Sequence, residues 1–360
     1  MSNVFDYIAW RGDLTFKENR LNSVDNFIFC MLSYIDMNRI FLNYNPNVRF
    51  SLSLASDEFC SNISEKEIRL GAILPSKDIR KLFEVAGRCN RFSKVEISDF
   101  VNRIDYSEEM QFCALTFHLS ESEMFIAFRG TDDTLAGWKE DFKLSYLESI
   151  PSQKCAHEYL MSVANKYHDK KIYVGGHSKG GNLAKYAATY CDDTVKERII
   201  TVYNNDGPGF LADAIDIAEF EKIEPKVKNY IPQSSLVGQM FENRGQRIIV
   251  KSNVRGIYQH DCFSWQVKGA GVVALKKISR DGEKNNKFFD NSIMKMSPDE
   301  RREFVKIFCE IIDQTGAKTL MEISEAKFKS VSSVMKSFKN LDKDKKALMY
   351  MFISRLMEAK

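Results

Sequence analysis

A sharp turn between an apolar segment and a helix-forming segment constrains the fold of this chain more than any other feature. The motif Gly176-His-Ser178-Lys-Gly180 lies between the apolar Lys171–Gly175 and the helix formers of Gly180–Cys191. Glycines are needed there because the chain changes from strand to helix within a few residues, where a Cβ would collide with the neighbouring backbone. The motif therefore predicts a strand, a tight turn that exposes Ser178, and a helix whose N-terminus lies beside that serine.

Segments with strand and helix character alternate through the middle of the chain. Phe112–Leu119 and Met124–Phe128 are rich in aromatic and branched residues and are expected to form a hairpin. A helix is expected at Ser152–His168. Further strands are expected at Arg198–Asn204, Val227–Ile231 and Gln246–Lys251. This order predicts a mostly parallel sheet with helices on its faces, whose functional sites lie beyond the carboxyl ends of the strands.

The two ends of the chain differ from this middle part. Residues 1–105 are expected to be helical or irregular, with one helix at Asn22–Asp36 and another that begins at Pro75–Ser76. From about Ser279 onward, amphipathic helices are expected. The sequence therefore predicts a main domain at 1–278, which includes 1–105 as its N-terminal part, and a helical extension at 279–360.

Three helices are predicted within this extension. Ser297-Pro-Asp-Glu300 has the cap, proline and glutamate that are typical of a helix start. Two more helices are expected around Thr319–Lys339 and Lys343–Glu358. Their lysine-rich faces would allow peripheral contact with an anionic membrane, but solvated faces on a helical cap are the favoured interpretation.

Charge and composition argue against several classes of protein. A net charge of +3 over 360 residues argues against a nucleic-acid partner held mainly by phosphate contacts. No segment is apolar for long enough to span a bilayer, and Met1–Arg11 lacks the pattern of a secretory signal. The 8 cysteines include no CxxC pair, so reduced thiols are expected rather than a zinc site or redox dithiol. We expect a cytoplasmic protein without a metal or an organic cofactor.

Ser178 is the candidate nucleophile, and His260 is the candidate general base. In folds that place a serine at such a turn, the chain order is nucleophile, acid, histidine. Of 5 histidines, only His260 follows Ser178, and it lies in the loop after the last expected strand. His177 is adjacent to the serine and is expected to point away from it. The alternatives are a structural glycine turn at Ser178 and an unrelated loop histidine at position 260.

Asp206 is the candidate acid that would orient the histidine. It follows the expected strand Arg198–Asn204 and lies in the tight turn Asn205-Asp-Gly-Pro-Gly209. The alternative is that Asp206 only caps this turn through its own backbone. The later strand ends in Pro232-Gln-Ser-Ser235, where no carboxylate is present.

An oxyanion hole is expected from two loops. One donor would be the backbone N–H of Lys179, directly after the nucleophile. The other would come from Thr131, which follows the strand Met124–Phe128, unless that loop is a plain hairpin exit. Met240 and Phe241 lie between the acid and base segments and would line a pocket for an apolar acyl chain, or belong to the core.

These motifs resemble two related groups of proteins. Phe128-Arg-Gly-Thr131, Trp138, Asp141 and Gly176-His-Ser-Lys-Gly-Gly181 resemble the class 3 lipases. The chain resembles a second group more specifically, over about Asp6–Trp265. This group is the bacterial Mbeg-like proteins, a lipase-like branch of the α/β-hydrolases. The segments that carry this second resemblance are Asp6-Tyr-Ile-Ala-Trp-Arg-Gly-Asp13, Asn22-Ser-Val-Asp-Asn26, Asn205-Asp-Gly-Pro-Gly209 and Gln259-His-Asp261.

The resemblance implies an α/β-hydrolase fold and hydrolysis of a carboxylic ester, with a small-molecule or lipid ester as substrate. By position, Ser178 matches the lipase nucleophile, Thr131 the oxyanion residue and His260 the base. Class 3 lipases carry their acid after the strand that here ends in Gln233-Ser-Ser235. Either Asp206, one strand earlier, takes that role, or the site works as a weaker dyad.

Two further points stay open at this stage. Lys179 stands where lipases often have an apolar residue, so its side chain either favours an anionic substrate group or is solvated. The competing functions are a non-catalytic relative that binds or scaffolds, and a serine acyltransferase or thioesterase that uses the same chemistry.

Overall fold

The computed structural model describes residues 2–38, 40, 48–62, 76–319, 322, 342, 343, 345 and 346. Its strands are β1 (Phe50–Ser51), β2 (Glu96–Asp105), β3 (Met110–His118), β4 (Glu123–Phe128), β5 (Lys171–His177), β6 (Ile199–Asn205), β7 (Val227–Pro232), β8 (Gln246–Val250), β9 (Val267–Lys268), β10 (Gly271–Val272) and β11 (Ala274–Leu275). Its α-helices are α1 (Val4–Arg11), α2 (Ser23–Leu32), α4 (Leu52–Asn62), α5 (Ser76–Arg88), α6 (Asn90–Ser93), α7 (Leu135–Lys143), α8 (Pro151–Lys166), α9 (Lys179–Tyr190), α10 (Asp193–Arg198), α11 (Ile217–Ile223), α12 (Arg280–Phe289) and α13 (Pro298–Asp313).

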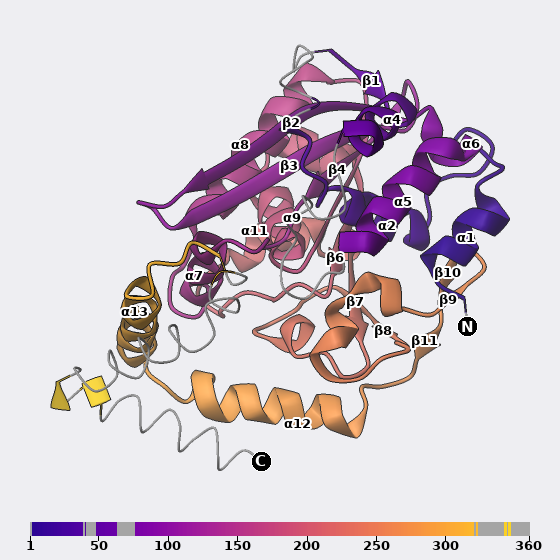
Figure 1. Cartoon of the computed structure of the whole chain (residues 1–360). Coiled ribbons are helices and arrows are strands. Elements are labelled where there is room, and N and C mark those ends of the chain that lie inside the picture. Colours follow the sequence, from indigo (N-terminus) through magenta and orange to yellow (C-terminus); the bar gives the residue numbers. More distant parts are fainter. Residues whose placement is uncertain are drawn as a thin grey trace.

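One sheet of nine strands organises the molecule (Figure 1). The strands lie in the order β1-β2-β3-β4-β5-β6-β7-β8-β11. Strands β4 to β8 are parallel, whereas β1 to β4 pair antiparallel and β11 pairs antiparallel with β8. Because β5, β6 and β7 are neighbours, the loops that leave their carboxyl ends lie side by side, which is where a site is expected in such a sheet.

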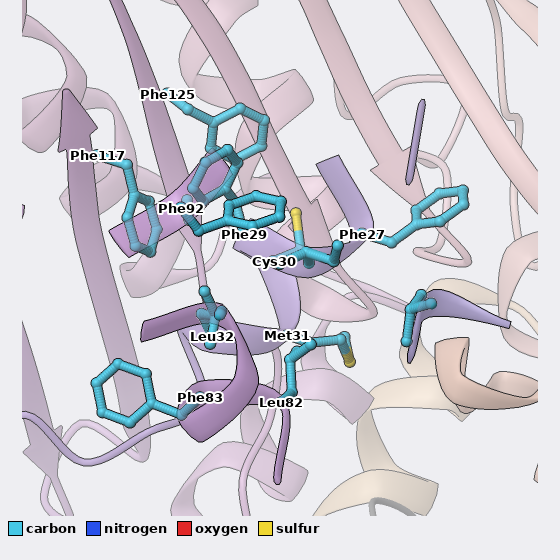
Figure 2. Close-up of a cluster of buried hydrophobic side chains, with 14 of the residues drawn as sticks. Phe27, Phe29, Cys30, Met31, Leu32, Leu82, Phe83, Phe92, Phe117 and Phe125 are labelled. Carbon is cyan, nitrogen blue, oxygen red and sulfur yellow. The ribbon is translucent and has the colours of Figure 1, made fainter. Parts of the chain in front are cut away.

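Helices cover both faces of this sheet. On one face α8 and α9 pack together, and buried apolar side chains such as Leu160, Val174 and Leu183 form the core beneath them. The other face is covered by α2, which contacts β4, β5 and α5. Figure 2 shows this second core around Phe29 of α2, whose ring centroid lies 4.7 Å from that of Phe117 on β3.

The middle of the chain forms the predicted arrangement. The hairpin of β3 and β4 is present, and β5 to β8 then add in chain order with helices between them. Strands β4, β5 and β6 are buried along almost their whole length on both faces, which explains why they are apolar runs rather than alternating patterns. The α/β-hydrolase fold class is confirmed.

The prediction for residues 1–105 was partly wrong, because Glu96–Asp105 form β2 within the main sheet. Only Ile97 and Ser98 of this strand are buried, and several of its other side chains are charged or amide groups. A register shift between Ser98 and Val101, where Asp99 has φ +55°, also breaks the alternation of faces. Periodicity therefore gave no strand signal here.

The helix predicted to start at Ser297 is present as α13. The Ser297 hydroxyl accepts a hydrogen bond from Glu300 N at 3.2 Å, and Glu300 Oε2 accepts one from Ser297 N at 2.7 Å. Figure 1 shows α13 beside α7, and the rings of Phe142 and Phe308 lie 5.1 Å apart there. The helices predicted at Thr319–Lys339 and Lys343–Glu358 lie almost wholly outside the described residues.

The division into domains at residue 278 stays a prediction. In the part of the chain that the structure describes, no helix is long and apolar enough to cross a membrane.

Candidate active site

Ser178 lies at a sharp turn between β5 and α9. Its backbone has φ +56° and ψ −132°, a conformation that residues other than glycine seldom adopt. The turn is held in place because Ser178 N donates to Asn205 O at 3.0 Å and Gly181 N donates to Ser178 O at 2.9 Å. The surrounding backbone therefore imposes this strained conformation and presents the serine at the end of the sheet.

The glycines of the motif are explained by close backbone contacts. A Cβ on Gly176 would lie 2.1 Å from the carbonyl carbon of Gly180. A Cβ on Gly180 would lie 2.1 Å from Phe128 O, at the end of the neighbouring strand β4. Both separations are far below van der Waals contact, so the strand-to-helix turn fits against β4 only with glycine at these positions.

His260 and Asp206 meet although 54 residues separate them. His260 Nδ1 lies 2.7 Å from Asp206 Oδ2, and both side chains are buried. Since a carboxylate only accepts, Nδ1 carries the proton of this contact, and Nε2 is the ring nitrogen that Asp206 does not engage. Within the described residues no hydrogen bond joins Ser178 Oγ to His260, and such contacts are often loose in enzymes without substrate.

The Asp206 carboxylate is held from a second side by the loop after β7. Ser235 Oγ donates to Asp206 Oδ1 at 2.5 Å, and Gly238 N donates to the same oxygen at 3.1 Å. Burial raises the pKa of Asp206, while the hydrogen bonds from His260, Ser235 and Gly238 act in the opposite direction. The carboxylate thus points away from its own turn, so the turn-capping alternative does not describe its contacts.

The His177 side chain contacts the loop that carries His260, a role that the sequence did not predict. Its Nε2 donates to His260 O at 2.7 Å, because a carbonyl oxygen only accepts. Burial lowers the pKa of His177 well below its ordinary value, so the ring is neutral and Nδ1 accepts from the Tyr34 hydroxyl at 2.9 Å. Tyr34, His177 and the backbone of His260 therefore form one buried chain of hydrogen bonds.

The loop after β4 lies against the nucleophile. A Cβ on Gly130 would lie 3.0 Å from Ser178 Cβ and 2.4 Å from His177 O, so this loop and the serine turn are in direct contact. Thr131 follows, and its hydroxyl donates to Asp141 Oδ2 at 2.6 Å. Burial raises the pKa of Asp141 to about 6. Because the Thr131 hydroxyl is engaged, the backbone N–H of Thr131 is the better candidate donor to an oxyanion.

Lys179 has two parts with different surroundings. Its backbone N–H is the first of α9 and therefore has no partner within the helix. Its side chain is buried, and Nζ donates to Glu140 Oε2 at 2.8 Å and to Gln111 O at 2.8 Å. Both interpretations of the Lys179 side chain were therefore wrong, since it is neither solvated nor available to a substrate anion.

Ser178 and His260 line one cavity of about 420 Å³, which is within the range of small-molecule sites. Thr131, Lys179 and the predicted substrate-binding residues Met240 and Phe241 line the same cavity. Much of its wall is apolar and comes from the C-terminal segment, through Phe289, Ile293, Arg301, Phe304, Val305 and Phe308.

Comparison with known proteins shows to which family the chain belongs. The model of the Mbeg1-like family matches residues 86–310, which is more than half of the chain. The chain belongs to the Mbeg1-like family. A search among curated proteins gave no match.

Two solved structures are similar to this Mbeg1-like chain. The M37 lipase is 16% identical, with 61% of this chain and 70% of that chain covered and a TM-score of 0.36. The Lip2 lipase from Yarrowia lipolytica is 14% identical, with 49% and 71% covered and a TM-score of 0.31. At these scores neither comparison carries an argument, and the fold rests on the strand order and the serine turn described above.

The Mbeg1-like structure thus brings together the residues proposed from the sequence. Sequence reasoning did not identify four participants: Ser235, Tyr34, His177 as a support for the His260 loop, and Arg301. A signal existed only for Ser235, because the serine stands where class 3 lipases carry their acid. The other three lack a local sequence signal that would single them out.

Proposed function

We propose that this protein is a serine hydrolase that cleaves carboxylic esters through an acyl-enzyme. The observation that carries the proposal is the 2.7 Å contact between His260 Nδ1 and the buried Asp206, beside a cavity that His260 and Ser178 both line. A histidine whose Nδ1 is held by a carboxylate has Nε2 available as a general base. A serine on a strained turn at a helix N-terminus is the matching nucleophile.

The reaction follows from these positions. Ser178 Oγ attacks the ester carbonyl carbon while His260 Nε2 takes the hydroxyl proton, which it then gives to the departing alcohol. Asp206 keeps the ring in the required tautomer and stabilises its charged form. The N–H groups of Thr131 and Lys179 stabilise the oxyanion. Water, activated by His260, then attacks the acyl-enzyme and releases the acid.

The form of the substrate is suggested by the cavity wall. Met240 and Phe241 offer an apolar surface, and the Phe241 ring packs against Phe289 of α12 with centroids 5.3 Å apart. An acyl chain would lie against such a surface with favourable burial of apolar area. The proposal is therefore an esterase or lipase-like enzyme without a metal or cofactor, and the expectation of a cytoplasmic location stays with it.

The experiment that tests the proposal is labelling by a fluorophosphonate. Wild type is expected to be labelled, whereas Ser178→Ala and His260→Ala lose labelling. His168→Ala is a matched control, because the His168 side chain is 77% exposed and should leave labelling unchanged. A folded wild type without labelling would contradict the enzyme proposal and favour a binding role.

Unlabelled wild-type enzyme would next be offered esters with water alone or with an added alcohol. Release of free acid supports hydrolysis. Transfer of the acyl group to the alcohol in preference to water would assign the protein to the acyltransferases.

A further inference from the structure

Arg301 is a buried cation in the apolar wall of the active-site cavity. It lies in the first turn of α13 and is 8% exposed. Phe304 and Val305, from the next turn of the same helix, line the cavity with it. The side chain therefore faces the space that Ser178 and His260 also face.

The Arg301 guanidinium has no carboxylate partner among the described residues. NH1 contacts Met294 Sδ at 3.7 Å, and the buried Nε has no hydrogen-bond acceptor there. Burial lowers the pKa of Arg301, and no acidic group of the described chain opposes that effect.

The other buried arginines within the described ranges are paired. Arg91 is fully buried and contacts Asp25 at 2.6 Å, with further bonds to backbone carbonyls. Arg129 contacts Asp132 at 2.9 Å. Arg301 therefore differs from these two arginines in lacking an anion, although it is also largely buried.

A buried charge without a partner is strongly unfavourable, because desolvation is not repaid by an ion pair. The guanidinium fork matches an anion with two oxygens, either a carboxylate or a phosphate. Its position in a substrate cavity indicates that the missing partner arrives with the ligand.

We propose that the cavity binds an anionic amphiphile, in which an acyl ester carries a phosphate or carboxylate group and Arg301 binds that anion. This inference rests on the proposed function and names its substrate class. The acyl chain lies against the apolar wall, and the ester carbonyl lies at Ser178. Lys179 also lines the cavity, but its side chain is buried and paired with Glu140. Arg301 is therefore the group that selects anionic over neutral esters.

The first test measures binding without catalysis. Decyl phosphate, decanoate and decanol each contain an unbranched chain of about ten carbons, and none contains a carboxylic ester. Binding is read from tryptophan fluorescence, because Trp138 lines the cavity. Wild type is expected to bind at least one of the two anions about 10- to 100-fold more tightly than decanol, which corresponds to hydrogen bonds to a charged group.

The anion that wild type prefers shows which anionic group the substrate carries. Preference for decyl phosphate assigns a phosphate-bearing ester, and preference for decanoate assigns a carboxylate-bearing one. Equal dissociation constants for decanol and both anions would overturn the proposal.

Variants locate the effect. Arg301→Gln is expected to abolish the preference for the anion, and Arg301→Lys to retain only part of it, because the charge remains but the fork is lost. Arg302→Gln is the matched control, since the neighbouring Arg302 side chain is 57% exposed and contacts Asp299 instead. Thermal unfolding of each variant checks folding. An unchanged preference in folded Arg301→Gln would refute the assignment.

A second test uses hydrolysis. Values of kcat/KM are measured for 1-decanoylglycerol 3-phosphate and for 1-decanoylglycerol. The value for the phosphate ester divided by the value for the neutral ester is expected to fall about 10- to 100-fold in Arg301→Gln and to stay constant in Arg302→Gln. Anion binding without hydrolysis of either ester would refute the proposed function and leave the anion site standing. Hydrolysis with no preference in wild type would refute the anion site alone.

Discussion

The substitution Asp206→Asn tests the most specific feature of the candidate site. The asparagine side chain has nearly the same shape and tolerates the backbone conformation at this position, where φ is +52°. The change removes the negative charge and can place an N–H, rather than an oxygen, opposite His260 Nδ1. The histidine would then be held in the other tautomer, with Nε2 protonated and unable to accept the proton of Ser178.

The expected fall in kcat follows from the contact that the Asp206 carboxylate makes with His260. It accepts a 2.7 Å bond from a buried histidine that becomes cationic in the transition state of the proposed reaction. Loss of that acid in a serine triad lowers kcat about 10⁴-fold, or about 5 kcal/mol of transition-state stabilisation. We expect a fall of this size in kcat for a chromogenic decanoate ester, with little change in the unfolding free energy.

Two companion variants sharpen this measurement. Asp213→Asn changes an exposed carboxylate that lies between Ser178 and His260 in the sequence, and it is expected to leave kcat unchanged. Asp206→Asn combined with Ser235→Asp restores a carboxylate from the position whose hydroxyl now contacts Asp206, and should recover part of the lost rate. A fall of less than about 10-fold in the single variant would refute the role given to Asp206.

Three further predictions concern stability. Gly176→Ala places a Cβ 2.1 Å from the carbonyl carbon of Gly180, so we expect a loss of at least about 1–3 kcal/mol in urea unfolding; wild-type stability would contradict the packing described. Lys179→Met leaves the buried Glu140 unpaired, and we expect about 3–5 kcal/mol of destabilisation, which an unchanged denaturation midpoint would exclude. Burial lowers the pKa of Lys185 from 10.5 to about 7, so between these values the folded state binds fewer protons than the unfolded state and stability rises with pH. The rise is up to about 1.4 kcal/mol per pH unit, and it should be smaller in Lys185→Met when unfolding is compared at pH 7 and pH 9; an equal slope in both proteins would argue against this origin.

Sequence reasoning succeeded where local chemistry determines structure. The apolar runs of β3 to β8 and the glycines around Ser178 are local signals, because burial on both faces and backbone collision act on consecutive residues. Chain order then selected His260 among few histidines. Asp206 was reached in the same way, since strand ends converge in a parallel sheet.

The remaining features depend on contacts between distant segments. The polar strand β2 is recognisable only through its pairing with β3. Helix α12 has few apolar residues, and only Gly282 and Phe289 are buried, so its periodicity was too weak to predict. Arg301 resembles any charged residue in the first turn of a helix until the cavity is seen around it.

The packing of α2 has a consequence for any attempt to shorten this protein. The family match begins at residue 86, yet Phe27 of α2 packs against Trp265 with ring centroids 4.9 Å apart, and Tyr34 holds the ring of His177. A fragment cut at the limits of the match would expose the aromatic face shown in Figure 2 to solvent. We therefore expect a fragment limited to residues 86–310 to aggregate, because it would lack the helix that covers this aromatic face.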